Sequence, residues 1–74
     1  MPKLPRQLKP REVINALKRL GFTETGSKGS HLHFKHLDGR RTQVAVHPKP
    51  IPQGTFKAIL RQAKLSVDDF LKNL

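Results

Sequence analysis

The sequence predicts an α+β domain with the order α-β-β-β-α and a short helix at the end, in which a three-stranded antiparallel sheet carries its helices on one face. Two apolar stripes with helical spacing flank a central region where apolar and polar residues alternate, as in half-buried strands. The connections between the alternating segments are too short for parallel crossovers, so neighbouring strands should run antiparallel. A chain of 74 residues has room for one such domain.

The first helix is predicted over residues 10–20. Pro10 suits the first helical position because its missing N–H is not needed there. Glu12 in the first turn complements the helix dipole, and Gly21 is a typical stop. The apolar stripe that should face the core recurs at Val13, Leu17 and Leu20.

The chain before this helix, residues 1–9, holds two prolines and three basic residues among few apolar ones. Such a composition is typical of a terminal segment that nothing ties down. We therefore expect a flexible basic arm at residues 1–9 and a single domain over residues 10–74.

Strands are predicted at residues 22–25, 31–37 and 42–47, with a loop at 26–30. The loop between the second and third of these strands decides which residues face the core, because directly opposite residues on paired strands share a face. An odd-length loop, Leu37-Asp38-Gly39 with Gly39 left-handed, is required to bring all the alternating apolar residues together. These residues are Leu32, Phe34, Val44 and Val46.

The same parity places a polar set on the opposite, open face of the sheet: His31, His33, Lys35, Gln43, Ala45 and His47. His31 and His47 should lie opposite or diagonal, roughly 5–8 Å apart at Cβ. His36 has core parity near the turn, where we expect it to be structural or exposed. The glycines of the 26–30 loop would let backbone N–H groups approach an anion closely.

Prolines at positions 48, 50 and 52 must end the third strand. Ser66, with Asp69 three residues on, resembles a capping box that opens a short last helix. The clearest amphipathic helix lies between these features, with apolar residues at Phe56, Ile59, Leu60 and Ala63.

The chain is strongly basic: it has fifteen Lys and Arg residues and five Asp and Glu residues, for a net charge of +10. Such a balance favours a polyanionic partner, with nucleic acid the first candidate and an acidic protein the second. The chain has no cysteine, no membrane-length apolar run and no secretory signal, which suits the cytoplasm. The predicted RNA contacts are Lys28, Gly29, Ser30, Lys35, Arg40, Arg41 and Lys49.

The convergence of histidines and cations suits cleavage of a phosphodiester in RNA. That reaction needs a base for the 2′-OH proton, an acid for the leaving oxygen and cations for the phosphorane, and histidine can supply either proton transfer. No carboxylate cluster stands ready to hold catalytic magnesium, so a route without metal or other cofactor is expected.

Other interpretations of these residues stay open. An exposed strand histidine is usually a plain surface residue. His31 and His33, with His47 as a third ligand, would also suit zinc, although no fourth ligand is evident. The 26–30 loop does not have the residue order of a phosphate-binding P-loop. Its two serines have no evident triad acid.

Three segments together resemble HicA-type toxins, the messenger-RNA interferases of bacterial toxin–antitoxin systems. They are "EVINALKRLGF" (residues 12–22), "GSKGSHLHF" (26–34) and "VAVHPKPIPQGTFKAILRQAKLSVDDF" (44–70). The similarity covers residues 10–70, nearly the whole domain. Two positions depart from the family pattern: Ala45 stands where proline is frequent, and Lys64 stands where glycine is common.

The resemblance implies a fold like that of a double-stranded-RNA-binding domain, with mRNA as substrate and His31 as the catalytic histidine. It also implies a HicB-type antitoxin that masks the site in a prokaryotic cytoplasm. We expect His31 to act as the base and Lys28 or the loop N–H groups to hold the phosphate, with His33 and His47 as possible auxiliary residues. Two alternatives are a non-catalytic RNA-binding module and a protein whose basic face only meets an acidic partner.

Overall fold

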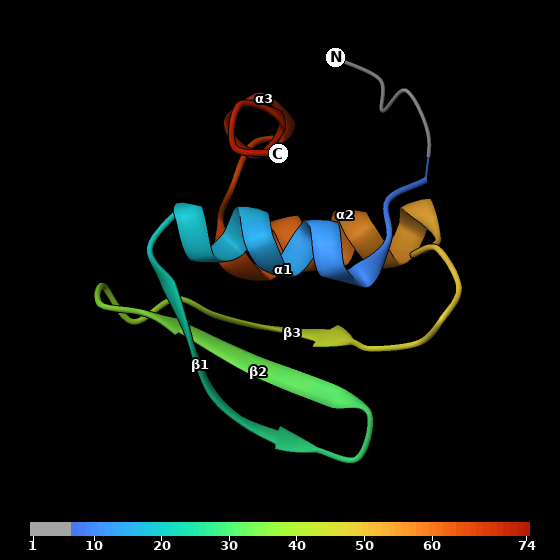
Figure 1. The fold of residues 1–74 in the computed structure, drawn as a ribbon. Coiled ribbons are helices and arrows are strands. Elements are labelled where there is room, and N and C mark those ends of the chain that lie inside the picture. Colours follow the sequence, from blue (N-terminus) through green and yellow to red (C-terminus); the bar gives the residue numbers. More distant parts are fainter. Residues whose placement is uncertain (1–6) are drawn as a thin grey trace.

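The computed structural model describes residues 7–74 and confirms the predicted fold class (Figure 1). The chain forms a helix, three strands and two further helices, in the order that the family resemblance implies. The elements are α1 (Pro10–Arg19), β1 (Phe22–Lys28), β2 (His31–His36), β3 (Arg41–Ala45), α2 (Gln53–Ala63) and α3 (Val67–Leu71).

The sheet is antiparallel with β2 in the middle, between β1 and β3. Helices α1 and α2 cover one face of the sheet, and α3 lies on the far side of these helices from the sheet (Figure 1). Phe56 of α2 and Phe70 of α3 meet edge to face, with ring centroids 4.9 Å apart. The largest fully buried side chains are Phe34, Phe70, Leu8, Leu17, Val13 and Val44.

The β2–β3 hairpin has the register that the parity argument requires. Leu32 pairs with Val44, and the connecting loop is Leu37-Asp38-Gly39, closed by a bond from Gly39 N to His36 O of 2.9 Å. Gly39 is left-handed at φ 98°, as predicted. An odd loop therefore keeps the alternating apolar residues of both strands on the helix side.

Val46 is the exception, and its predicted place in the core is wrong. Strand β3 ends at Ala45, and the Val46 side chain is 47% exposed, although its N–H still donates to Ser30 O at 2.7 Å. Val46 instead lines an open hollow beside the first turn of α1. Val46 follows the last residue of β3, so the apolar alternation continues beyond the end of the strand and its last member lies outside the core.

Strand β1 is longer than predicted, and the expected loop at 26–30 is wrong. The strand continues to Lys28, with an irregularity in register between Glu24 and Gly26, and only Gly29 and Ser30 form the turn. Gly29 is left-handed at φ 61°, which suits the first central position of a two-residue hairpin turn. Gly26 therefore belongs to a bulged strand, a setting where glycine is frequent.

The predicted arm, residues 1–9, lies outside the described residues for its first six positions. Its last three positions are anchored to the domain. Leu8 is 2% exposed, and its carbonyl accepts a hydrogen bond of 2.7 Å from Ile51 N. The packed domain therefore begins before Pro10, and residues 7–9 tie down the proline-containing segment that precedes α2.

Two caps form where α2 ends and α3 begins, and the second is the Ser66 cap that the sequence predicts. Lys64 occupies the left-handed position after α2, with φ 53° and ψ 45°, and Leu65 N donates to Leu60 O at 2.9 Å. Ser66 Oγ accepts from Asp69 N at 3.1 Å and opens α3. The non-glycine residue at position 64 leaves the fold intact.

Candidate active site on the open sheet face

His31 lies exposed at the first position of β2, on the sheet face that no helix covers. The parity of β2 requires this, because its neighbour Leu32 packs against the core on the other face. His31 is therefore accessible to a substrate, which is the first requirement for a catalytic histidine.

Lys28 is the direct cross-strand partner of His31 on β1, and Ala45 is its partner on β3. Directly opposite residues have Cβ atoms about 4.5–5.5 Å apart and point to the same face. The turn of Gly29 and Ser30 fixes this pairing. The site thus combines a titratable imidazole, a cation and a tight glycine turn, three features that the sequence placed nearby without fixing their geometry.

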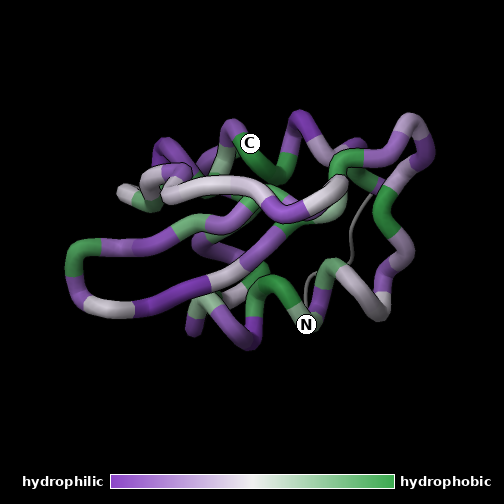
Figure 2. The backbone as a smooth tube through the Cα atoms, turned by 90° about the horizontal axis from the view of Figure 1, so that it is seen from below, coloured by the Kyte–Doolittle hydropathy of each residue, from purple (hydrophilic) through white to green (hydrophobic). Residues whose placement is uncertain are grey.

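Two further rows of residues extend the open face away from His31. His33 lies between Gly26 and Gln43, and Lys35 lies between Thr23 and Arg41. None of the paired positions on this face is acidic. Along β2 hydrophilic and hydrophobic residues alternate, as the colours of the tube show from below the sheet (Figure 2).

A depression of about 490 Å³ lies over these outer rows and includes His33, Lys35 and Arg41. Gly26, which has no side chain, also lines it, and a Cβ at that position would meet nothing within 4 Å. The depression is therefore bordered by cations and leaves room for a backbone phosphate to approach the sheet.

Arg40, predicted as an RNA contact, is engaged within the protein. Its Nε donates to Asp38 Oδ2 at 2.8 Å, and its NH1 donates to the Ala63 carbonyl at 2.9 Å. Its guanidinium also lies 5.2 Å from the centroid of the Phe22 ring. Arg40 therefore fastens the β2–β3 loop to the end of α2, a role that its sequence neighbourhood did not reveal.

The backbone N–H of Arg40 and then its side chain hold the pKa of Asp38 below its ordinary value of 3.8. The N–H donates to Asp38 Oδ1 at 3.1 Å. The loop therefore carries a charged carboxylate that is bonded on both oxygens, while the sheet face beside it stays cationic.

His36 is structural, one of the two roles expected for it. Its ring meets Phe22 edge to face at 5.1 Å, and its Nδ1 accepts from Asp38 N at 3.2 Å. Gly21 lies so close that a Cβ there would stand 2.8 Å from His36 Nε2. His36 thus closes the core at the end of the sheet opposite His31.

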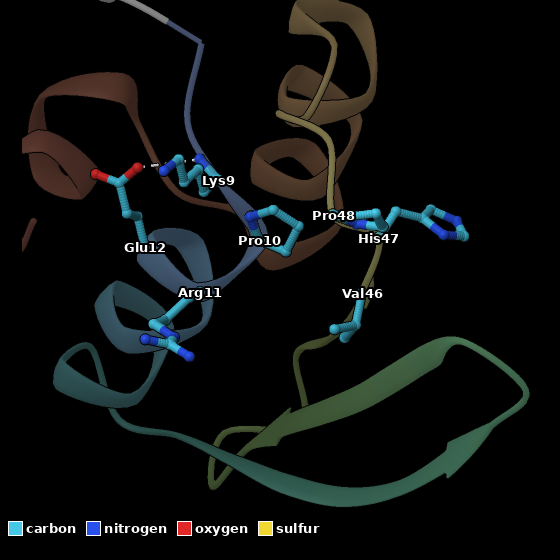
Figure 3. Close-up of a pocket in the computed structure, with 7 residues that line it drawn as sticks. All are labelled: Lys9, Pro10, Arg11, Glu12, Val46, His47 and Pro48. Atoms are coloured by element: carbon cyan, nitrogen blue, oxygen red, sulfur yellow. Dashed lines mark hydrogen bonds between the residues drawn. The ribbon is translucent and has the colours of Figure 1, made fainter.

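His47 does not sit within the sheet beside His31. Strand β3 ends two residues earlier, and His47 belongs to the extended segment that leads toward α2. Its ring points away from the hollow that Pro10 and Arg11 line (Figure 3). His47 and Lys49 both line a second cavity, at the outer edge of β3.

Over residues 7–74, no three His, Cys, Asp or Glu side chains gather closely enough to hold a metal ion. The alternative zinc site of His31, His33 and His47 is therefore not formed. In the same residues, no helix has the length and apolar character needed to cross a bilayer.

These features define a class: a small, strongly basic α+β domain with an exposed histidine and a partner lysine on a helix-free sheet face. Residues 10–65 match the family model described as HicA toxin of bacterial toxin–antitoxin systems. The chain belongs to the HicA toxin family and is thus a toxin of a toxin–antitoxin system. No curated protein matches the chain.

Proposed function

We propose that this toxin is an endoribonuclease that cleaves mRNA with His31 and without a metal ion, and that a HicB-type antitoxin neutralises it. The observation that carries the proposal is the pairing of His31 with Lys28 on an exposed face whose cross-strand pairs contain no acidic residue. Membership of the HicA family supports the toxin role, and the basic charge supports a polyanionic substrate.

In this mechanism His31 accepts the proton of a ribose 2′-OH, and the resulting oxygen attacks the adjacent phosphorus. The bond from phosphorus to the 5′-oxygen breaks, and that oxygen takes a proton from a protonated side chain or water. The products are a 2′,3′-cyclic phosphate and a 5′-OH. His33 lies two residues along the same strand face and is the nearest histidine in β2 to serve as the acid.

The Lys28 ammonium stabilises the negative charge that grows on the phosphorane oxygens. A charge-assisted hydrogen bond of this kind contributes most where water is displaced by substrate. The backbone N–H groups of the Gly29 and Ser30 turn are further donors for the same phosphate. Arg40 is left out of this set of RNA contacts because its Nε and NH1 already donate to Asp38 and Ala63.

The remaining RNA contacts are Lys35 and Arg41 on the open face and Lys49 at its edge. Such contacts bind phosphates by charge, so affinity should fall steeply as salt rises. An antitoxin that presents acidic residues to this face would cover His31 and compete with RNA for the same cations.

The test compares the unaltered protein with His31→Ala on a structured mRNA fragment in excess EDTA. His31 is exposed, so the variant should fold normally and keep its RNA affinity while it loses cleavage. A melting curve and a gel-shift titration serve as controls. If both proteins bind and neither cuts, the protein is a non-catalytic RNA-binding module. If RNA binding is weak at every salt concentration, the basic face serves only a protein partner.

A further inference from the structure

We propose that the cavity at the outer edge of β3 holds one nucleobase of the RNA, next to the bond that is cut. The inference rests on the proposed function and adds a binding site to it. The cavity has a volume of about 370 Å³ and lies between the end of β3, the proline-containing segment and the first half of α2.

The first support is position. Ala45 lines the cavity and is also the direct cross-strand partner of His31. Cα atoms of such partners are about 4.5–5.5 Å apart. A nucleotide whose phosphate lies at His31 therefore needs to pass only the small Ala45 side chain to place a neighbouring base in the cavity.

The second support is the chemistry of the wall. Ile51 and the flanking Pro50 and Pro52 form an apolar surface, against which a base can lay its face. His47 and Lys49 follow Ala45 at every second position of the extended chain and line the same cavity. An imidazole for stacking and an ammonium for phosphate suit a nucleotide better than an apolar peptide segment.

The third support is that the cavity is preformed. Prolines restrict the backbone of the segment, and the bond from Ile51 N to Leu8 O pins its middle. A preformed wall lowers the entropy cost of ordering a ligand. Because Ile51 N is already bonded, it offers no donor to a base edge, and the cavity should respond to the presence and size of a base more than to its identity.

The hollow beside α1 is a weaker candidate, although it is larger at about 820 Å³. Glu12 lines it, and its Oε1 accepts a hydrogen bond of 3.0 Å from the backbone N–H of Lys9 (Figure 3). A carboxylate at that place would repel the phosphate of a bound nucleotide. No residue paired with His31 lines this hollow.

The test fills the cavity from α2, with the variant Thr55→Leu. Thr55 lines the cavity and is exposed, so a larger side chain there occupies the space without disturbing the core. Gln53→Leu is the matched control, because it adds the same side chain in the same helical turn outside the cavity. The substrates are short RNAs in which one abasic nucleotide is moved through the cleavage site.

With the unaltered protein, an abasic site at one nucleotide beside the cut bond should lower kcat/KM about tenfold, the cost of one lost stacked base. Thr55→Leu should lower kcat/KM by a similar factor on intact RNA, with no further loss on that abasic RNA. Gln53→Leu should match the unaltered protein. A flat abasic scan, or equal behaviour of the two leucine variants, would overturn the proposal.

A binding assay separates this inference from the proposed function. The probe is an RNA with a 2′-deoxy nucleotide at the cut position and 2-aminopurine as the neighbouring base, read by fluorescence. Loss of the fluorescence change with Thr55→Leu alone supports the pocket even if the protein proves unable to cleave RNA. If Thr55→Leu leaves this signal unchanged and weakens only antitoxin binding, the cavity receives a partner peptide and the proposal is wrong.

Discussion

Lys28 and His31 face each other across a turn of only two residues, on the one sheet face that no helix covers. The pairing is set by backbone hydrogen bonds and by the left-handed Gly29, so it does not depend on a contact between the two side chains. A cation and an imidazole are thereby held on one surface before any RNA binds.

Replacing Lys28 with Gln should lower kcat/KM for RNA by about 10- to 100-fold, because one charge-assisted hydrogen bond to the phosphorane is lost. Thermal stability should change little, because Lys28 is exposed. Cleavage rates and melting curves measure the two effects. Lys57→Gln, an exposed lysine of α2, removes the same charge away from His31 and should have a much smaller effect on cleavage. Equal losses in both variants would mean that only net charge matters.

Truncation of Leu8 to Ala should cost about 2–5 kcal/mol of unfolding free energy, since a buried side chain is removed from the core. That is a large share of the stability of a small domain. Chemical denaturation measures the change. Leu37→Ala is the control, because Leu37 is fully exposed at the β2–β3 loop and its loss should alter stability by less than about 0.5 kcal/mol. A Leu8→Ala variant as stable as the control would show that residues 7–9 are not part of the folded core.

The Asp38 carboxyl predicts a pH effect on stability. Its pKa is lowered in the folded protein, first by the backbone N–H of Arg40 and then by the guanidinium, so its charged form favours folding above the ordinary pKa of 3.8. This contribution is lost as the pH falls through the lowered value. The melting temperature of Asp38→Asn should therefore lie below that of the unaltered protein near neutral pH, and the gap should close under acidic conditions. A gap that stays constant with pH would contradict the ionic role of Asp38.

Lys64→Gly should raise stability by about 1 kcal/mol, because a left-handed residue with a Cβ is strained and glycine is not. For a domain of this size the melting temperature should rise by about 4–8 °C. Lys72→Gly is the matched control. Lys72 ends α3 in a right-handed conformation, so glycine relieves no strain there and should not stabilise. A gain of equal size at both sites would attribute the effect to lost charge.

Local sequence patterns were sufficient to predict most of the secondary structure of this protein. The helical spacing of α1 and α2, the cap at Ser66 and the odd loop that ends in Gly39 all follow from interactions between residues near in sequence. The parity of the β2–β3 hairpin then placed His31 on the open face, because a strand turns each successive side chain to the other side.

Only the tertiary structure decided where each helix or strand begins and ends, and which basic side chains remain available to contact a partner. Gly26 and Ser27 read as loop residues, yet pairing with β2 draws them into a strand and brings Lys28 opposite His31. The sequence predicts that Leu8 belongs to a flexible arm, yet its carbonyl accepts a hydrogen bond from Ile51 N. It predicts that Arg40 contacts RNA, yet the guanidinium donates to the carbonyl of Ala63. Both partners are distant in the sequence. The spacing of residues in the sequence predicts interactions within one strand or helix. Where an element ends, and which groups a long side chain contacts, depends on residues that only the folded chain brings near.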